Sequence, residues 1–300
     1  PVQPAPQPAA QTAVPEWEVC LGNVVVPNAQ AEVLRQLVPE PYASLETFPL
    51  RVLMWRRIHA ALKVRRFKPF TFRGHTWLAV DLGLRDRLGR CKLYAALAPD
   101  VKARLRGVHQ LFLTRVCALG DSCPLADGSL SYFGVDLLEQ LGSGQPLPPP
   151  HLMAPAEAAF DPTRVTVGKW SHLGLRLERV REALGTAALD YPDDMSLADA
   201  LDAAKERALE GARQGDPRFL PATAWHEEHG AWSHFLPLYV TPGATRPELV
   251  AVIVACGEDA YSWCTVLPAE AAALKALRSN NPQAVWVFDL LRRQTGDLAA

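Results

Sequence analysis

The chain has 300 residues, 49% of them hydrophobic, and a formal net charge of −1 at pH 7. This length suits one large domain or two ordinary ones, with enough apolar content to bury a core. The sequence has no run of about 18 apolar residues and no signal-peptide pattern, so we expect a cytoplasmic protein that does not enter a membrane.

The six cysteines are scattered, and their spacing matches neither a zinc knuckle nor a Cys-x-x-Cys motif. We interpret them as buried free thiols of a reducing cytoplasm. The chain also lacks a P-loop, a dinucleotide-binding glycine motif, a Gly-x-Ser-x-Gly elbow and a kinase signature. Nucleotide-driven enzymes and common hydrolases are therefore disfavoured, and we expect no cofactor.

Two breaks divide the chain. Residues 1–15 are rich in Pro, Ala and Gln, which predicts a disordered linker. Residues 141–150 are rich in Gly and Pro, which predicts a surface connection between a first part, 16–145, and a second part, 151–300. No internal repeat is visible in the sequence.

The first part combines helices with short strands. Residues 28–38 predict a helix that Pro39 ends. Apolar residues recur every three to four positions from Leu50 to Lys63, which predicts an amphipathic helix. Residues 70–80 predict two strands joined by a tight turn at Arg73-Gly74-His75, and further strands are expected at 90–97 and 107–119. A helix followed by a basic hairpin is the order of a winged helix.

The second part begins with helices and continues with strands. Helices are expected at 171–184 and at 196–213, the latter with Ser196 as its N-cap. Further elements are strands at 233–240, 248–257 and 261–268, a helix at 268–279 and a final strand at 284–291. Helices and strands are grouped, so the predicted class is α+β: a basic, winged-helix-like N-terminal part packed on a C-terminal antiparallel sheet with helices.

Two stretches resemble a bacterial family of domains without an assigned function. "TWLAVDLGL" and "CKLYAAL" (Thr76 to Leu97) and "HFLPLYV…PELVAVIV…YSWCTVLPAEAA" (His234 to Ala272) are similar to its strands and turns. Members of that family are often joined to cold-shock or OST-HTH/LOTUS nucleic-acid-binding modules. The family's Asn-Thr pair is replaced here by Asp81-Leu82, and the glycine of its Tyr-x-Gly-x-Thr turn is replaced by Trp263. The resemblance therefore implies a link to nucleic acid and no particular activity.

The charges are strongly segregated along the chain. Residues 51–115 hold 16 Lys or Arg and 3 Asp or Glu, whereas the remainder holds 15 basic and 29 acidic residues. Such asymmetry indicates a nucleic acid or another polyanion as partner. The alternative is that the two parts neutralise each other across an internal interface.

The stretch from Leu50 to His75 has eight Lys or Arg and no acidic residue. Cations along a path bind phosphates, and exposed aromatic rings between them stack on unpaired bases. Phe67, Phe70, Phe72 and Trp77 fit either stacking or a core position. We predict that bases are reached by Trp55 and His75 and that phosphates are bound by Arg51, Arg56, Arg57, Lys63, Arg65, Arg66, Lys68 and Arg73.

Two clusters raise the alternative of metal-dependent catalysis. His226, His229 and His234 are weak candidates for metal ligands, which we interpret as members of a solvated loop. The acidic run from Asp190 to Asp202 fits a magnesium site, but acids before a helix are also favoured by the helix dipole.

The leading hypothesis is a nucleic-acid-binding protein, for DNA or RNA, that uses a basic-aromatic surface without intrinsic catalysis. The alternatives are a metal-dependent enzyme acting on nucleic acid or nucleotides, and a module that docks an acidic protein partner. A homodimer formed through the C-terminal part is a further alternative for its partners. We expect no cofactor and no membrane contact.

Overall fold

The computed structural model describes residues 16–72, 74–119, 159–167, 177–226, 231–256, 259–277 and 284–292. Both breaks predicted from composition, 1–15 and 141–150, lie outside the described residues. Helices and strands are both present and grouped along the chain, so the α+β class is confirmed.

The N-terminal half forms a five-stranded sheet of order β1-β5-β4-β3-β2. Strand β1 is parallel to β5, and the remaining pairs are antiparallel. The strands are β1 (Val24–Val25), β2 (Lys68–Phe72), β3 (His75–Arg85), β4 (Lys92–Pro99) and β5 (Leu111–Leu119). The helices of this half are α1 (Glu16–Val19), α2 (Asn28–Leu37), α3 (Thr47–Lys63) and α4 (Val101–Arg104).

The C-terminal half forms a second five-stranded sheet of order β6-β10-β9-β8-β7. Its strands are β6 (Val165–Val167), β7 (Ala222–His226), β8 (Ala231–Leu238), β9 (Leu249–Ala255) and β10 (Ala260–Pro268). Its helices are α6 (Leu177–Leu184), α7 (Asp194–Arg213), α8 (Ala269–Ala276) and α9 (Val285–Leu291).

The two halves have the same order and pairing of strands, although the sequence shows no internal repeat. Among the described residues of each half, a short first strand is followed by two α-helices of at least eight residues and a four-stranded meander, and the last strand pairs parallel with the first. A backbone path requires only a pattern of apolar positions and turns, so two segments can share it without sharing residues.

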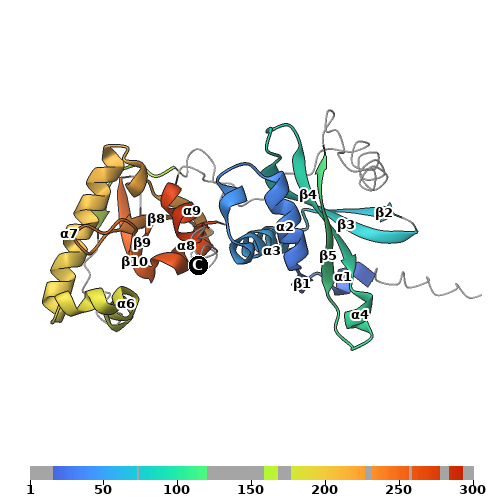
Figure 1. Cartoon of the computed structure of the whole chain (residues 1–300), viewed down its shortest axis with the longest axis horizontal. Coiled ribbons are helices and arrows are strands. Elements are labelled where there is room, and N and C mark those ends of the chain that lie inside the picture. The colour runs from blue at the N-terminus through green and yellow to red at the C-terminus, as the bar shows by residue number, and fades with distance from the viewer. Residues whose placement is uncertain are drawn as a thin grey trace, which may run out of the picture.

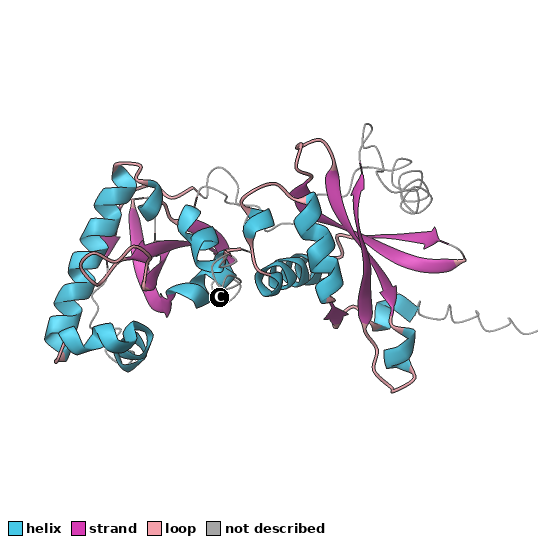
Figure 2. Cartoon of the chain, in the orientation of Figure 1, coloured by secondary structure: helices cyan, strands magenta, loops and turns pink. Residues whose placement is uncertain are grey.

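The halves are stacked as layers and share a central apolar core (Figures 1 and 2). Figure 1 shows α7, the C-terminal sheet, α8 with α9, α2 with α3, and the N-terminal sheet in that order. The central core joins Leu53 of α3 and Leu78 of β3 to Ala272 of α8. Across the same interface the rings of Tyr42 and Phe288 meet edge to face at 5.2 Å. The basic half is therefore supported by the acidic half through apolar packing.

The hairpin predicted between residues 70 and 80 is confirmed. Phe72 pairs with His75, which leaves Arg73 and Gly74 as the connecting residues. Gly74 has φ +77°, a backbone conformation that the missing Cβ permits at such a tight turn. The hairpin follows α3 as in a winged helix, but it forms the edge of a larger sheet.

Two local predictions are wrong. The N-cap of α7 is Asp193, which accepts from the Ser196 backbone N–H, while Ser196 occupies the third helical position of a capping box. Residues 285–291 form helix α9 in place of a strand, with Trp286 and Phe288 buried in the central core. The strand preference of aromatic and β-branched residues is weak and is overridden here by tertiary packing.

Five of the six cysteines lie in the described ranges. There the thiols of Cys20, Cys91 and Cys117 are buried and form no disulfide, whereas the thiol of Cys256 is exposed. None of the helices in those ranges is long and apolar enough to cross a membrane.

Candidate nucleic-acid interface

Helix α3 carries the first half of the basic stretch. Its apolar face, which includes Leu50 and Leu53, is buried in the central core. On the other face Trp55 is 42% exposed and stacks on His59, with ring centroids 5.1 Å apart. Arg51 is half-buried, and its Nε donates to the carbonyl of Val26 at 2.9 Å. Arg51 therefore attaches α3 to the end of β1.

Arg57 is buried, so its predicted role as a phosphate contact is wrong. It is 1% exposed, and a guanidinium nitrogen donates to the carbonyl of Leu82 at 2.5 Å. The β3–β4 ladder shifts register between Asp81 and Leu84, and Arg57 satisfies a carbonyl within that irregularity. Burial lowers the pKa of Arg57. The helical spacing from Leu50, Leu53 and Met54 already places residue 57 on the apolar face.

Helix α3 ends in a Schellman motif that has arginine at the usual glycine position. The Arg66 N–H donates to Ala61 O and the Arg65 N–H donates to Leu62 O, at 2.8 and 3.1 Å. Arg65 has φ +54°, which costs roughly 1–2 kcal/mol for a residue with a Cβ. The fold thus holds Arg65, a cationic residue, at the surface in a left-handed backbone conformation that is unfavourable for it.

The turn after α3 packs against the short helix α1. The Arg65 side chain is 65% exposed and forms an ion pair with Glu18 at 3.0 Å. Phe67 meets Trp17 edge to face at 5.4 Å and packs against the central core. Among the other predicted phosphate ligands, Lys63 is exposed, Arg73 lies outside the described residues, and three are half-buried: Arg56, Arg66 and Lys68.

The three acids of residues 51–115 are all engaged within the N-terminal half. Buried Asp81 pairs with Lys92 at 3.2 Å, and Asp86 accepts from the backbone N–H groups of Arg90 and Cys91. Asp100 accepts from the Gln110 side chain and from the Ala103 N–H, and these bonds lower its pKa. These carboxylates serve turns and a helix cap. Most of the local positive charge is therefore not offset by acids of the same segment.

A cavity of about 600 Å³ lies at the end of the N-terminal sheet where β3 begins and β4 ends. The aromatic side chains that line it are Trp17 from α1 and His75 and Trp77 from β3. Helix α4 contributes Val101 and Arg104 to the lining. His75 is exposed and Trp77 is half-buried. The structure thus brings His75 together with two indoles and an arginine, whereas Trp55 does not line this cavity.

Of the two remaining aromatic residues of the stretch, Phe70 has a described side chain. Phe70 is 3% exposed and packs with Tyr94 and Ala96 on the face of the sheet opposite α3. The core interpretation is therefore confirmed for Phe70. The Phe72 side chain lies outside the described part of the chain.

Residue-by-residue prediction missed Trp17 and the cations of the β4–β5 connection. Lys102, Arg104 and Arg106 are exposed around α4, and Leu105 between them is 84% exposed. The signal was present, because three cations alternate over residues 102–106 without an acid. Trp17 carried no such signal, since only folding brings α1 beside β4.

The prediction of a solvated loop is wrong for His234. His226 ends β7, and His234 lies in β8, opposite Thr223. His234 is 3% exposed, and its Nδ1 lies 3.0 Å from Thr223 Oγ1. Burial, with a smaller contribution from Arg164, lowers the pKa of His234 to about 4. His229 and the His226 side chain lie outside the described residues, and no group of three metal-binding side chains occurs within them.

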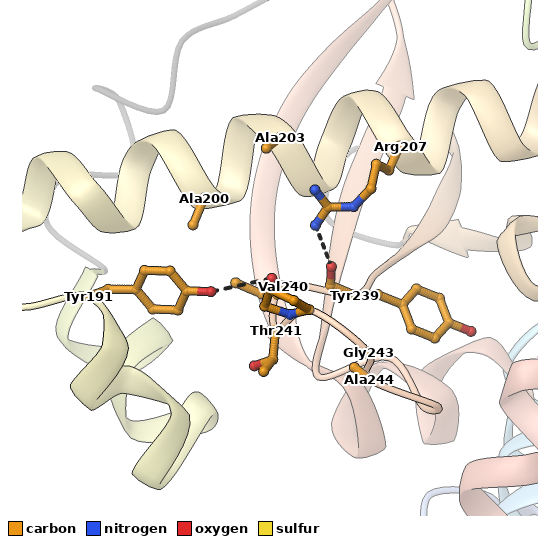
Figure 3. Close-up of a pocket in the computed structure, with 10 residues that line it drawn as sticks. Tyr191, Ala200, Ala203, Arg207, Tyr239, Val240, Thr241, Gly243 and Ala244 are labelled. Carbon is orange, nitrogen blue, oxygen red and sulfur yellow. Dashed lines mark hydrogen bonds between the residues drawn. The ribbon is translucent and has the colours of Figure 1, made fainter.

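The acidic run before α7 has structural partners. Asp193 caps the helix, and Asp194 pairs with Arg181 at 3.0 Å. A cavity of about 410 Å³ lies beside this run, between α7 and the β8–β9 loop (Figure 3). There Tyr191 donates to Val240 O, Arg207 donates to Tyr239 O, and the described lining residues include no acid, histidine or cysteine. The described lining of this cavity therefore provides no carboxylate, imidazole or thiol ligand for a metal.

No protein-family model, no curated protein and no solved structure matches this chain. The resemblance of Thr76–Leu97 and His234–Ala272 to a family linked with nucleic-acid-binding modules therefore stays a prediction. The assignment of function rests on the geometry and charge of the N-terminal half.

Proposed function

We propose that this protein binds nucleic acid through the basic surface of its N-terminal half. The observation that carries the proposal is the excess of cations over residues 51–115, whose three acids are all engaged in local structure. Exposed Arg104 lines an aromatic cavity, and exposed Arg65 pairs with Glu18 of α1, the helix that supplies Trp17 to the same cavity. Cations bind the phosphates of a single strand, and aromatic rings beside them stack on its unpaired bases.

The backbone of Arg65 supports this proposal independently. Strain in a native structure persists where the surrounding structure enforces it, and it concentrates at functional positions. Glycine would end α3 without this strain. The arginine instead presents a largely exposed guanidinium beside α1.

Internal neutralisation by the acidic half is the competing explanation of the charge. Two ion pairs of the basic segment, Arg65 with Glu18 and Lys92 with Asp81, stay within the N-terminal half. The core that joins the halves is built from apolar side chains of α3, α8 and α9. These observations favour an external polyanion. Nucleic acid is favoured over an acidic protein because indole and imidazole rings line the adjacent cavity.

The affinity should depend steeply on salt. If four to six phosphates are contacted, counterion release predicts that affinity falls by roughly 10²–10³ between 50 and 200 mM salt. Fluorescence anisotropy with labelled single-stranded and duplex DNA and RNA measures this slope. A complex that is insensitive to salt, or no complex with any of the four probes at 50 mM, would overturn the proposal.

Replacing Arg65 with glycine should change stability and binding in opposite directions. Arg65→Gly removes the left-handed strain and should raise the free energy of unfolding by about 0.5–1 kcal/mol. The loss of one phosphate contact should weaken binding by about 5-fold at 150 mM salt. Arg65→Ala is the matched control, because it removes the cation and keeps the strain. Urea unfolding and anisotropy test both effects, and unchanged binding by the glycine variant contradicts a role for Arg65.

A further inference from the structure

We infer that the cavity between α1, β3 and α4 binds one unpaired nucleobase together with its phosphate. Single-stranded nucleic acid is then the class of ligand that this protein binds. This inference rests on the proposed function and makes it more specific. The cavity is lined by Trp17, His75, Trp77 and Arg104, and its volume of about 600 Å³ lies within the range of small-molecule sites.

The cavity combines the two chemistries that recognise a nucleotide. The indoles of Trp17 and Trp77 and the imidazole of His75 offer π-faces, on which a base of any sequence can stack. Arg104 contributes a cation to the described lining, and a guanidinium binds phosphate oxygens with directed hydrogen bonds. Both chemistries come together only in the folded chain, because the rings belong to α1 and β3 and the arginine to α4.

The rings are held in place by the surrounding fold. Trp17 packs edge to face on Phe67, and the Arg65–Glu18 ion pair joins α1 to the turn after α3. Trp77 lies opposite Phe70 on the paired strand, with ring centroids 6.4 Å apart. A stacking surface fixed before binding loses less side-chain entropy when the base enters.

A base inside a duplex is stacked and paired, so it cannot reach such a cavity without being extruded, which costs a few kcal/mol. A single strand presents its bases freely. Exposed Lys102 and Arg106 flank Arg104 outside the cavity, and they provide contacts for the phosphates of neighbouring nucleotides. A strand should therefore bind more tightly than a free nucleotide, which offers the same base and phosphate without the neighbours.

The test compares four probes on the full chain: an eight-nucleotide poly(U), the corresponding poly(dT), a blunt duplex and the mononucleotide UMP. Both single strands should bind about 5–100-fold more tightly than the duplex, the range expected from base stacking. UMP should bind weakly and compete with the strands. UMP that binds as tightly as the strands would overturn the inference in favour of a free-nucleotide site.

Variants locate the site within the basic surface. His75→Glu and Arg104→Glu should remove the preference for single strands, and Trp17→Phe should reduce the quenching of tryptophan fluorescence by poly(U). Arg90→Glu is the matched control, because it removes an exposed cation at the β3–β4 turn, beyond the opposite end of β3. Circular dichroism verifies that each variant is folded, and a variant that is not folded is replaced by His75→Gln or Arg104→Gln.

The two proposals fail in different ways. Equal affinity for single strands and duplex, or equal losses in Arg90→Glu and Arg104→Glu, overturns the cavity assignment and leaves nucleic-acid binding intact. The absence of binding to every probe at 50 mM salt overturns the proposed function itself.

Discussion

Reversing three exposed cations of the N-terminal half should abolish nucleic-acid binding and leave the fold intact. The variant is Lys63→Glu, Lys102→Glu and Arg106→Glu, with the three side chains at the end of α3 and around α4. Each lost phosphate contact removes counterion release and adds repulsion, so the affinity should fall by at least about 100-fold at 150 mM salt. The slope of log K against log salt concentration should decrease by about 3.

Stability distinguishes this outcome from a structural role of the charges. Changes at exposed positions typically alter the free energy of unfolding within about ±0.5 kcal/mol each, so the melting temperature should stay near the wild-type value. The matched control reverses Arg213, Arg218 and Arg246, which are exposed in the acidic half. If both triple variants lose binding equally, the interaction follows net charge alone. If the first variant unfolds, its cations stabilise the structure.

Acidification should destabilise the protein through His234. The pKa of this imidazole is about 4 in the folded chain and 6.5 in the unfolded chain, so the unfolded state binds more protons between these values. The contribution of neutral His234 to the free energy of unfolding is therefore fully present above pH 6.5, and it is lost as the pH falls toward 4. The linkage predicts a loss of about 2 kcal/mol from this group between pH 7 and pH 5.

Replacing the imidazole separates the loss of stability caused by protonation of His234 from the loss caused by protonation of carboxylates. The replacement His234→Gln keeps a hydrogen-bonding group near Thr223 and cannot be protonated in this range. Urea unfolding at pH 7, 6 and 5 should show the wild type losing about 2 kcal/mol more than the variant. Parallel pH profiles for the two proteins would contradict a buried, neutral His234. Because the imidazole packs against Phe160 and Tyr261, replacing it also lowers stability at pH 7.

The short-range features of the fold could be predicted because they depend on adjacent residues. The amphipathic pattern of Leu50–Lys63, the turn at Gly74 and the strand expected at 90–97, which the structure has at 92–99, follow from spacing and backbone preference. Helix α9 and the cap of α7 were assigned wrongly because their signals are weak. Aromatic residues favour a strand only slightly, and either Asp193 or Ser196 makes a chemically reasonable N-cap.

The composition of the basic surface was determined by the sequence, whereas the identity of its members was decided by tertiary structure. The excess of cations over 51–115 and the presence of rings among them can be read directly from the chain. Burial of Arg57 depends on a carbonyl near the β3–β4 irregularity, and burial of His234 depends on its place in the second sheet. The cavity requires Trp17 and Arg104, which lie 87 positions apart and meet only when α1 and α4 reach the same end of the sheet. Side-chain types and their spacing are local properties of the sequence, but the site is defined by long-range packing, which the local pattern does not encode.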